Sequence, residues 1–390
     1  MLRALYSAIS GLRSHQTMLD VTGNNIANVN TTGFKASATQ FQDTLSQLVK
    51  GASGPQAGAG GTNPAQIGLG VQVAAISTNF SQGSAQATGR ATDMMISGNG
   101  FFVVQSGGED LYTRAGSFSF DAGGRLVTPD GALVQGWTAV NGAISTSAGS
   151  MGPIVLPQNT VAPALATTSA TMTGNLPNDA PTGTVVSRDV DVYDGMGTSR
   201  TVTMNMTRTA GGWSVAASDG SATGTDTLAF TAGKLTSGAT MAIGGVTVDF
   251  SGVTGYAGLT TVVAARQDGR QAGTLQAFSI AKDGSLVGSY SNGATVPIAQ
   301  LAMATFTNPQ GLEKAGSSNY RSSINTGDVT IATAGSPGVG TLAGGSLEMS
   351  NVDLSQEFTN LIVAQRGFQA NARIITTSDE ILQELTNLKR

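Results

Sequence analysis

Hydrophobic residues follow a helical period near the N-terminus. Leu2, Leu5, Ile9, Leu12 and Leu19 are separated by three, four, three and seven positions. This spacing places them on one stripe of an amphipathic α-helix. The sequence therefore predicts a helix over residues 2–28, which ends among the glycine and asparagine residues at 23–28 because these residues favour helix C-termini.

The C-terminal segment, residues 353–388, has a stricter period. Its apolar residues Leu354, Leu361, Phe368, Ile375 and Leu382 recur at every seventh position. A period of seven keeps an apolar seam facing a partner helix, as in a coiled coil. We expect the two ends to pair with each other and with neighbouring copies of the chain. In a free monomer the stripes would be exposed, so we expect both ends to be largely disordered there.

The pattern changes after residue 28. Residues 30–35 have the composition of a turn, and Phe41, Leu45, Leu48 and Val49 allow a short second helix. Residues 51–64 are rich in Gly, Ala and Pro and have the composition of a linker. We therefore expect a connecting region between the first helix and the rest of the chain.

From residue 68 onward the apolar runs are short and are bounded mostly by Gly, Asp, Asn and Pro, which is typical of strands and turns. Residues 138–182, rich in Ala, Thr, Ser and Pro, favour a boundary between two sets of strands. The first set is predicted at residues 71–73, 101–104, 111–113, 118–120, 126–127 and 133–134, and the second at 185–193, 201–206, 241–250 and 260–263.

An internal echo suggests how these sets are arranged. Residues 118–120 are followed after five positions by Leu126-Val127, and residues 278–280 are followed after five positions by Leu286-Val287. Both intervening segments carry Gly and Asp, as hairpin loops do. We infer that residues 273–340 return to the domain that begins at 68–144.

The predicted fold is therefore mixed but mainly β, a nested multidomain axial arrangement. Its terminal α-helices form a coiled-coil-like layer, and one of its two β-rich domains is inserted in the other. The expected boundaries are as follows: a terminal helical domain at 1–30 and 352–390, a connecting region at 31–67 and 341–351, a β-rich axial domain at 68–145 and 270–340, and an inserted outer β domain at 146–269.

Composition narrows the function. Charged residues make up 11% of the chain, against about 25% in typical soluble proteins. The 53 glycines are about twice the usual share. A surface with so little charge has little colloidal repulsion, which suits a protein that contacts copies of itself. With a net charge of −4 and no basic run, nucleic-acid binding lacks its electrostatic footprint.

Candidate chemistry is sparse. The chain has no cysteine, which excludes thiol catalysis and disulfides, and one histidine, His15, which lies in the helical seam and is interpreted as structural or exposed. Asp189, Asp191 and Asp194 lack the Gly and Glu spacing of a calcium loop. We therefore expect the first two on the solvent-exposed face of a strand and the third in the turn that follows this strand. We expect no catalytic residue, metal or cofactor.

Neither a leader nor a membrane span is predicted. Arg13, His15 and Asp20 interrupt what would be the apolar core of a secretory signal. The sequence contains no stretch of 18 apolar residues. If the protein leaves the cell, we expect export without a cleaved signal peptide.

The ends carry more than a pattern, because their residues resemble two signatures of bacterial flagellar rod and hook proteins. Residues 5–12 are similar to that family's N-terminal signature, and so are residues 24–35, a segment that begins Asn24-Asn25-Ile26. Residues 350–354 and 362–372 are similar to its C-terminal signature. Residues 97–102 and 112–118 resemble the axial β domain that rod and hook proteins share. The resemblance covers about 1–145 and 270–390 and is weak over 146–265.

Within this family the sequence is more similar to hook subunits. The large inserted domain and residues 290–293 resemble the hook, and distal rod proteins are shorter. The resemblance implies a structural subunit of a curved helical tube that acts as a universal joint between motor and filament. The alternatives are a distal rod subunit or, in another class, a secreted β-rich enzyme or adhesin.

The resemblance also implies partners and contact residues. It implies a helical homopolymer in the extracellular hook, partners among the hook cap, distal rod and hook–filament junction proteins, and passage through the flagellar type III export apparatus, with no membrane insertion. We expect Leu5, Ile9 and Leu12 to pack with the seam of the C-terminal helix. The residues predicted to serve subunit packing and assembly are Leu5, Ile9, Leu12, Leu19, Asn24, Asn25, Ile26, Asn28, Phe34, Leu354, Phe358, Leu361, Phe368, Ile375 and Leu382.

Overall fold

The structure is a computed structural model that describes residues 2–55, 58, 60–140, 142–157 and 161–387. The chain forms two compact units. Unit 1 contains Met1–Leu156, Ser279–Val287 and Pro297–Arg390, and unit 2 contains Pro157–Phe278 and Gly288–Val296. The fold is mainly β with a helix at each end of the chain, and unit 2 is nested within unit 1 in sequence, as predicted. The finer domain boundaries given above stay a prediction.

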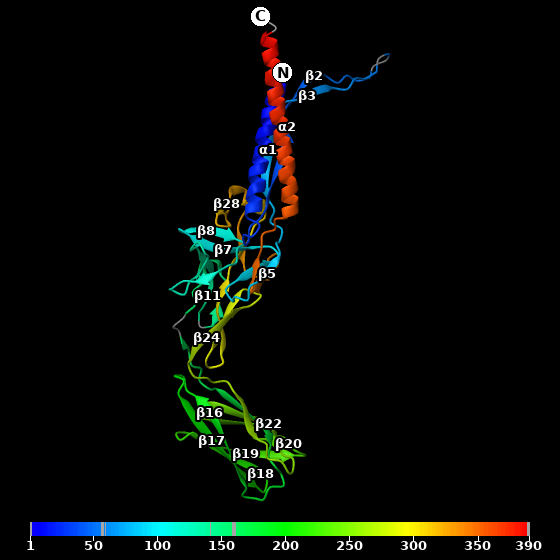
Figure 1. Cartoon of the computed structure of the whole chain (residues 1–390). Helices are drawn as coiled ribbons and strands as arrows, with labels where there is room; N and C mark the ends of the chain where they lie inside the picture. Colours follow the sequence, from blue (N-terminus) through cyan, green and yellow to red (C-terminus); the bar gives the residue numbers. More distant parts are fainter. Residues whose placement is uncertain (1, 56–57, 59, 141, 158–160, 388–390) are drawn as a thin grey trace. The chain divides into compact units, whose positions relative to one another are not determined.

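The terminal helices form where the hydrophobic period predicts them. Helix α1 spans Leu2–Ala27 and helix α2 spans Leu354–Asn387. Asp353 caps α2, because its Oδ1 accepts hydrogen bonds from the backbone N–H groups of Ser355 and Gln356. The two helices pack against each other in unit 1 (Figure 1). In the described part of the chain, neither helix is long and apolar enough to cross a membrane.

Strands, not a helix, follow α1, so the predicted short helix over residues 41–49 is wrong. Strand β1 (Ser37–Asp43) pairs antiparallel with β4 (Val71–Thr78), with Phe41 opposite Val73. Strand β2 (Ser46–Lys50) pairs with β3 (Ala65–Gly68). The apolar residues at 41–49 fit a helical period, but distant strands supply their backbone partners, and tertiary pairing overrides local preference. Residues 51–55 and 60–64 connect β2 to β3, and residues 56, 57 and 59 of the predicted linker lie outside the described residues.

The rest of unit 1 is built on an antiparallel sheet in which β26, β11, β7, β8, β29 and β28 are successive neighbours. All six strands predicted between residues 71 and 134 are present. The further strands with residues in unit 1 are β5 (Ala85–Ala87), β6 (Met94–Ser97), β7 (Phe101–Ser106), β8 (Glu109–Thr113), β9 (Ser119–Phe120), β10 (Leu126–Val127), β11 (Leu133–Val140), β12 (Ala143–Ile144), β13 (Met151–Pro153), β26 (Thr295–Leu301), β27 (Met303–Thr305), β28 (Glu313–Gly316), β29 (Asn319–Arg321), β30 (Thr330–Ala332), β31 (Thr341–Gly344) and β32 (Ser346–Glu348), with short 3-10 turns η1 (Ala148–Ser150), η2 (Pro309–Gly311) and η3 (Ile324–Thr326).

Aromatic side chains fill one core of unit 1. Phe101, Tyr112, Trp137 and Tyr320 are each at most 5% exposed and belong to one apolar cluster. Phe80 packs edge-on against both Phe101 and Tyr320, with ring centroids 5.4 and 5.3 Å apart. Aromatic pairs of this kind add stability beyond the burial of their area. This core holds together strands that are more than 200 residues apart in sequence.

The sequence echo corresponds to two matching hairpin turns. In the first, the Asp121 N–H donates to Arg125 O, and the Gly124 N–H donates to Asp121 O. In the second, the Ala281 N–H donates to Ser285 O, and the Gly284 N–H donates to Ala281 O. Gly124 and Gly284 both have positive φ, at 74° and 80°, which explains glycine there. The hairpin prediction is confirmed.

Unit 2 is a set of strands around its own core. Its main sheet runs in the order β16, β17, β18, β19, β20, β22, β15 and β23, with β21 beside β22. Its two end strands lie near each other, since Arg188 Nε on β16 donates to the O of Val262, the residue before β23, at 2.7 Å. Trp213 and Phe250 are almost fully buried inside it. The strands with residues in unit 2 are β14 (Val161–Ala162), β15 (Ser169–Asn175), β16 (Val185–Tyr193), β17 (Ser199–Thr209), β18 (Gly212–Ser218), β19 (Thr223–Thr231), β20 (Lys234–Ser237), β21 (Thr240–Ile243), β22 (Val246–Thr254), β23 (Val263–Gln267), β24 (Gly273–Ile280) and β25 (Ser285–Tyr290). Of these, β14, β24 and β25 belong to the sheet that contains β26, and β24 and β25 also have residues in unit 1.

Two strand predictions in unit 2 need correction. The single strand predicted at 241–250 is a hairpin, because Gly244 and Gly245 both adopt positive φ and turn the chain. The strand predicted at 260–263 begins only at Val263. The hydroxyl of Thr261 instead accepts a hydrogen bond from the Asn175 N–H.

The acidic run of unit 2 forms a strand and a turn, as predicted. Asp189 and Asp191 are exposed and alternate with buried Val190 and Val192 along β16. Asp194 Oδ1 accepts hydrogen bonds from the N–H groups of Met196 and Thr198 and closes the following turn.

Candidate functional site

Helices α1 and α2 run antiparallel in a fixed register. A Cβ atom built on Gly11 would lie 2.9 Å from the Asn371 side chain, and one on Gly367 would lie 2.5 Å from the His15 imidazole. Further along, Asn25 Nδ2 donates to Glu357 Oε1 at 3.0 Å. Each step forward along α1 is matched by an equal step back along α2 in these three contacts. The two helices therefore approach closely at their glycines.

The buried line of each helix consists of small or polar residues and not of leucines. Ala8, Gly11, Ser14, Thr22 and Asn25 are the buried positions of α1. Small side chains permit the close approach that the two glycines indicate. The α1 helix also packs against β1 and β4, where Ser10 Oγ accepts a hydrogen bond from the Val71 N–H at 3.2 Å. It therefore lies between α2 and a strand pair and uses two faces at once.

The predicted seam residues divide into two groups. Most are half-buried, so they flank the line of closest approach. Leu354 and Phe358, by contrast, are 39% and 51% exposed. The half-buried ones are Leu5, Ile9, Leu12, Leu19 and Ile26 on α1 and Leu361, Phe368, Ile375 and Leu382 on α2. Their assignment to subunit packing stays a prediction.

An apolar surface remains uncovered on α2. Ile362 and Val363 are 55% and 54% exposed, and Ile374 and Ile381 are each close to half exposed. Leu354, Phe358 and Ile362 lie on one side of the buried line of α2, and Val363, Ile374 and Ile381 lie on the other; we name the two sets together the outer face of α2. Exposed apolar residues along more than seven turns of one helix are unusual in a monomer and mark an interaction surface.

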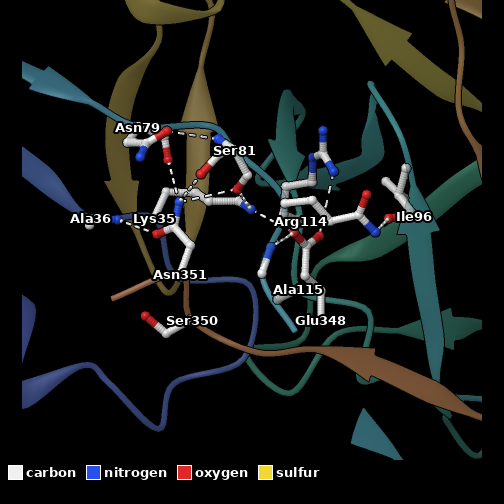
Figure 2. A network of polar contacts seen from close by, with 12 residues as sticks. Lys35, Ala36, Asn79, Ser81, Ile96, Arg114, Ala115, Glu348, Ser350 and Asn351 are labelled. Carbon is white, nitrogen blue, oxygen red and sulfur yellow. Dashed lines mark hydrogen bonds and ion pairs between the residues drawn. The ribbon is translucent and has the colours of Figure 1, made fainter. Parts of the chain in front are cut away.

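Below the helix pair lies a network of buried charges, which we name the base (Figure 2). Lys35 Nζ donates to Glu348 Oε1 at 2.6 Å and to Ser81 O at 2.7 Å. Arg114 approaches the other oxygen of Glu348, with NH1 at 3.5 Å from Oε2. All three side chains are at most 3% exposed. Burial lowers the pKa of Lys35 and of Arg114, and the Glu348 carboxylate partly opposes this.

Amide side chains join the chain ends to this base. Asn351 Oδ1 accepts from the Ala36 N–H at 2.9 Å, and its Nδ2 donates to Asn79 O at 2.8 Å (Figure 2). Asn25 is nearly fully buried and makes a reciprocal pair with Ser37, donating to its O and accepting from its N–H. Both asparagines therefore replace missing strand pairing where the chain turns.

The other predicted motif residues have local roles. Asn28 Nδ2 donates to Asn24 O, and its Oδ1 accepts from the Thr31 hydroxyl, which closes the end of α1. The ammonium of Lys314 lies 5.2 Å from the centre of the Phe34 ring. Gly33 has φ of 69°, and a Cβ there would lie 2.4 Å from the Ala115 backbone nitrogen. Only glycine fits at that point of the signature.

Several of these residues were not among those predicted from sequence. Glu348 and Asn351 lie just before the C-terminal helical stripe, Arg114 lies in the β region, and Glu348 is 313 positions from Lys35. The available signal is the scarcity of charge: in a chain that is only 11% charged, Lys35 at the end of the N-terminal signature and Glu348 just before the C-terminal one suggest a pair. That a second cation, Arg114, is buried with this pair can be learned only from the fold.

No enzymatic arrangement emerges within the described residues. Groups of three or more His, Cys, Asp or Glu side chains that could hold a metal are absent there. His15 packs edge-on against Phe41 at 5.8 Å, and its Nδ1 lacks a partner in the described part of the chain. The structure thus defines a class of protein in which paired terminal helices are joined to β-rich units.

Comparison with known proteins gives the family. The model described as "Flagella basal body rod protein" matches residues 5–35, that of the "Flagellar hook protein FlgE/F/G D1 domain" matches 95–174, and that of the "Flagellar basal body rod FlgEFG protein C-terminal" matches 343–388. The first and last contain most of both helices together with Lys35 and Glu348 of the base, and the second contains Arg114.

Relatives cover the whole chain. The flagellar hook protein FlgE of Borreliella burgdorferi is 37% identical over 100% of both chains. The flagellar basal-body rod protein FlgG of Bacillus subtilis is 36% identical over 100% of both, and FlgE of Escherichia coli K12 is 36% identical over 99% of this chain and 100% of its own. The chain therefore belongs to the flagellar hook and rod protein family, as a structural subunit of the flagellar hook.

Proposed function

We propose that this subunit polymerises through its terminal helices into the curved helical tube of the hook, which transmits torque while it bends. The observation that carries the proposal is the outer face of α2. Pairing with α1 leaves Phe358, Ile362 and Val363 more than half exposed in one copy of the chain. Burying each of them against neighbouring copies would contribute about 1 to 2 kcal/mol.

The remaining parts of the proposal follow from family membership. The rim of the tube would contact cap, distal rod and hook–filament junction proteins, and the subunit would reach the extracellular hook through the type III export apparatus without a cleaved leader. Residues 5–34 and 354–382 named above would serve subunit packing. Membership in a family of structural flagellar proteins argues against the enzyme alternative.

Electron microscopy tests this proposal. The concentrated full-length protein is compared with a chain that lacks residues 1–30 and 352–390, each with and without short hook fragments added as seeds. Tubes from the intact chain alone are expected. Compact monomers from both, even with seeds present, would favour an adhesin or enzyme.

A further inference from the structure

A cavity of about 310 Å³ lies beside the base in unit 1. Its lining includes Arg114 together with the apolar walls of Phe80, Phe101, Phe306 and Pro309. The Arg114 side chain is only 3% exposed, yet its Nε has no hydrogen-bond partner in the described part of the chain. Leaving a buried donor unpaired is costly, so this one calls for an explanation.

The charges of the base do not balance. Lys35 and Arg114 supply two cations, and Glu348 supplies one carboxylate. Glu348 Oε1 already accepts from Lys35 Nζ and from the Gly83 N–H at 2.9 Å, and Arg114 reaches only Oε2, at 3.5 Å. The guanidinium has five N–H donors, and the Phe101 ring 5.2 Å away offers it only a weak electrostatic partner. One positive charge is therefore left facing the cavity.

The group that fits is a carboxylate. A guanidinium pairs with a carboxylate through two parallel hydrogen bonds, and the aromatic walls suit the aliphatic part of an acidic side chain. We propose that this cavity receives an Asp or Glu side chain from a neighbouring copy of the chain, and so forms an assembly contact between β units. The inference rests on the proposed self-assembly.

Charge complementarity favours a second copy as the source. The chain has a net charge of −4. Asp20, Asp43, Glu313 and Asp328 are exposed, and no cation lies within ion-pair distance of them among the described residues. Each copy thus offers carboxylates as well as the cavity, which is the requirement for a head-to-tail contact that repeats along a polymer.

Thr307 provides the test, because it is exposed and lies on the wall of the same cavity. Thr307→Glu supplies a carboxylate within the chain, and Thr307→Gln is the matched uncharged control. We expect the Glu variant to raise the Tm of the free subunit by about 2–4 °C and to raise the critical concentration for polymerisation at least tenfold. The Gln variant should do neither. In an Arg114→Met background, the Tm gain from Thr307→Glu should disappear.

The other outcomes overturn the proposal. A Thr307→Glu subunit with unchanged or lower Tm would mean that the cavity does not take a carboxylate. A raised Tm with normal polymerisation would mean that the carboxylate does not come from a neighbouring copy. Equal loss of polymerisation in the Glu and Gln variants would make the effect steric. Failure of the unaltered chain to polymerise would contradict the proposed function, and the Tm comparison would still decide the carboxylate question.

Discussion

The base and the helix pair above it share the two terminal segments, to which the base adds Arg114, but they are completed in different ways. In the base, Lys35, Glu348 and Asn25 are buried and Asn351 is half-buried, and all four find their partners within one copy of the chain. In the helix pair, α1 and α2 touch through small residues, and the outer face of α2 remains exposed. A single copy thus pairs these four residues, while Arg114 Nε stays without a partner among the described residues and the helices remain exposed on one side. We infer that the base fixes where the helices begin, and that neighbours stabilise them.

The largest effect is expected at the base. Glu348→Gln leaves Lys35 and Arg114 buried without a full counter-charge, which should cost about 3 to 5 kcal/mol in the free energy of unfolding. Urea unfolding of the free subunit measures it. Glu313→Gln, an exposed position outside any ion pair of the described residues, should change stability by less than about 0.5 kcal/mol. Equal stabilities of the two variants would show that the base contributes nothing.

Substitutions on the outer face of α2 should weaken polymerisation without changing the stability of the free subunit. Ile362→Glu with Val363→Glu would place two charges in the proposed subunit contact. The critical concentration should rise about 10- to 100-fold, equivalent to about 1.4 to 2.7 kcal/mol. Urea unfolding of the free subunit should be unchanged. As a control, Thr223→Glu adds a charge at an exposed polar position of unit 2 and should leave polymerisation nearly normal.

A third comparison concerns the close approach of the helices. Gly11→Ala would place Cβ 2.9 Å from Asn371, whereas Gly23→Ala meets nothing within 4 Å. Both changes raise helix propensity equally, by about 1 kcal/mol. The difference between them therefore reports helix packing, and Gly11→Ala should be the less stable by about 1 to 3 kcal/mol, measured in the polymer by thermal unfolding. If both stabilise the polymer to the same degree, the helices do not pack as described.

The smallest effect involves pH and unit 2. Burial alone would raise the pKa of Asp268, but hydrogen bonds from the Thr168 hydroxyl and the N–H groups of Thr168 and Ser169 outweigh it and lower the pKa to about 2. Since the folded value is depressed, the stabilisation is present above about pH 4 and is lost as the pH falls toward 2. Asp268 is exposed, so solvent screening limits its contribution to the free energy of unfolding to about 1 kcal/mol.

Acid unfolding of Asp268→Asn against Asp189→Asn checks this expectation. Asp189 is exposed on a strand and holds no turn together. Only the Asp268 variant should flatten the loss of stability between pH 4 and 2. If stability falls with pH in the same way in both variants, Asp268 does not contribute to acid sensitivity.

The sequence predicted the elements whose signal is local. The period of seven located α2, and the repeated five-residue spacing located two hairpins that share the same hydrogen bonds. It failed where partners are distant. Residues 41–49 form strands because β4 and β3 pair with them, and no pattern within the segment contains that information. The base was missed for the same reason, since its charges come from three separate parts of the chain.

Hydrogen exchange of the backbone amides, in the free subunit and in the polymer, tests the central claim most directly. The account predicts that residues 33–37 and 346–351 are protected in both states, and that the amides of α1 and α2 gain most of their protection on polymerisation. Helices protected equally in the free subunit would contradict it, because a single copy would then suffice to stabilise them.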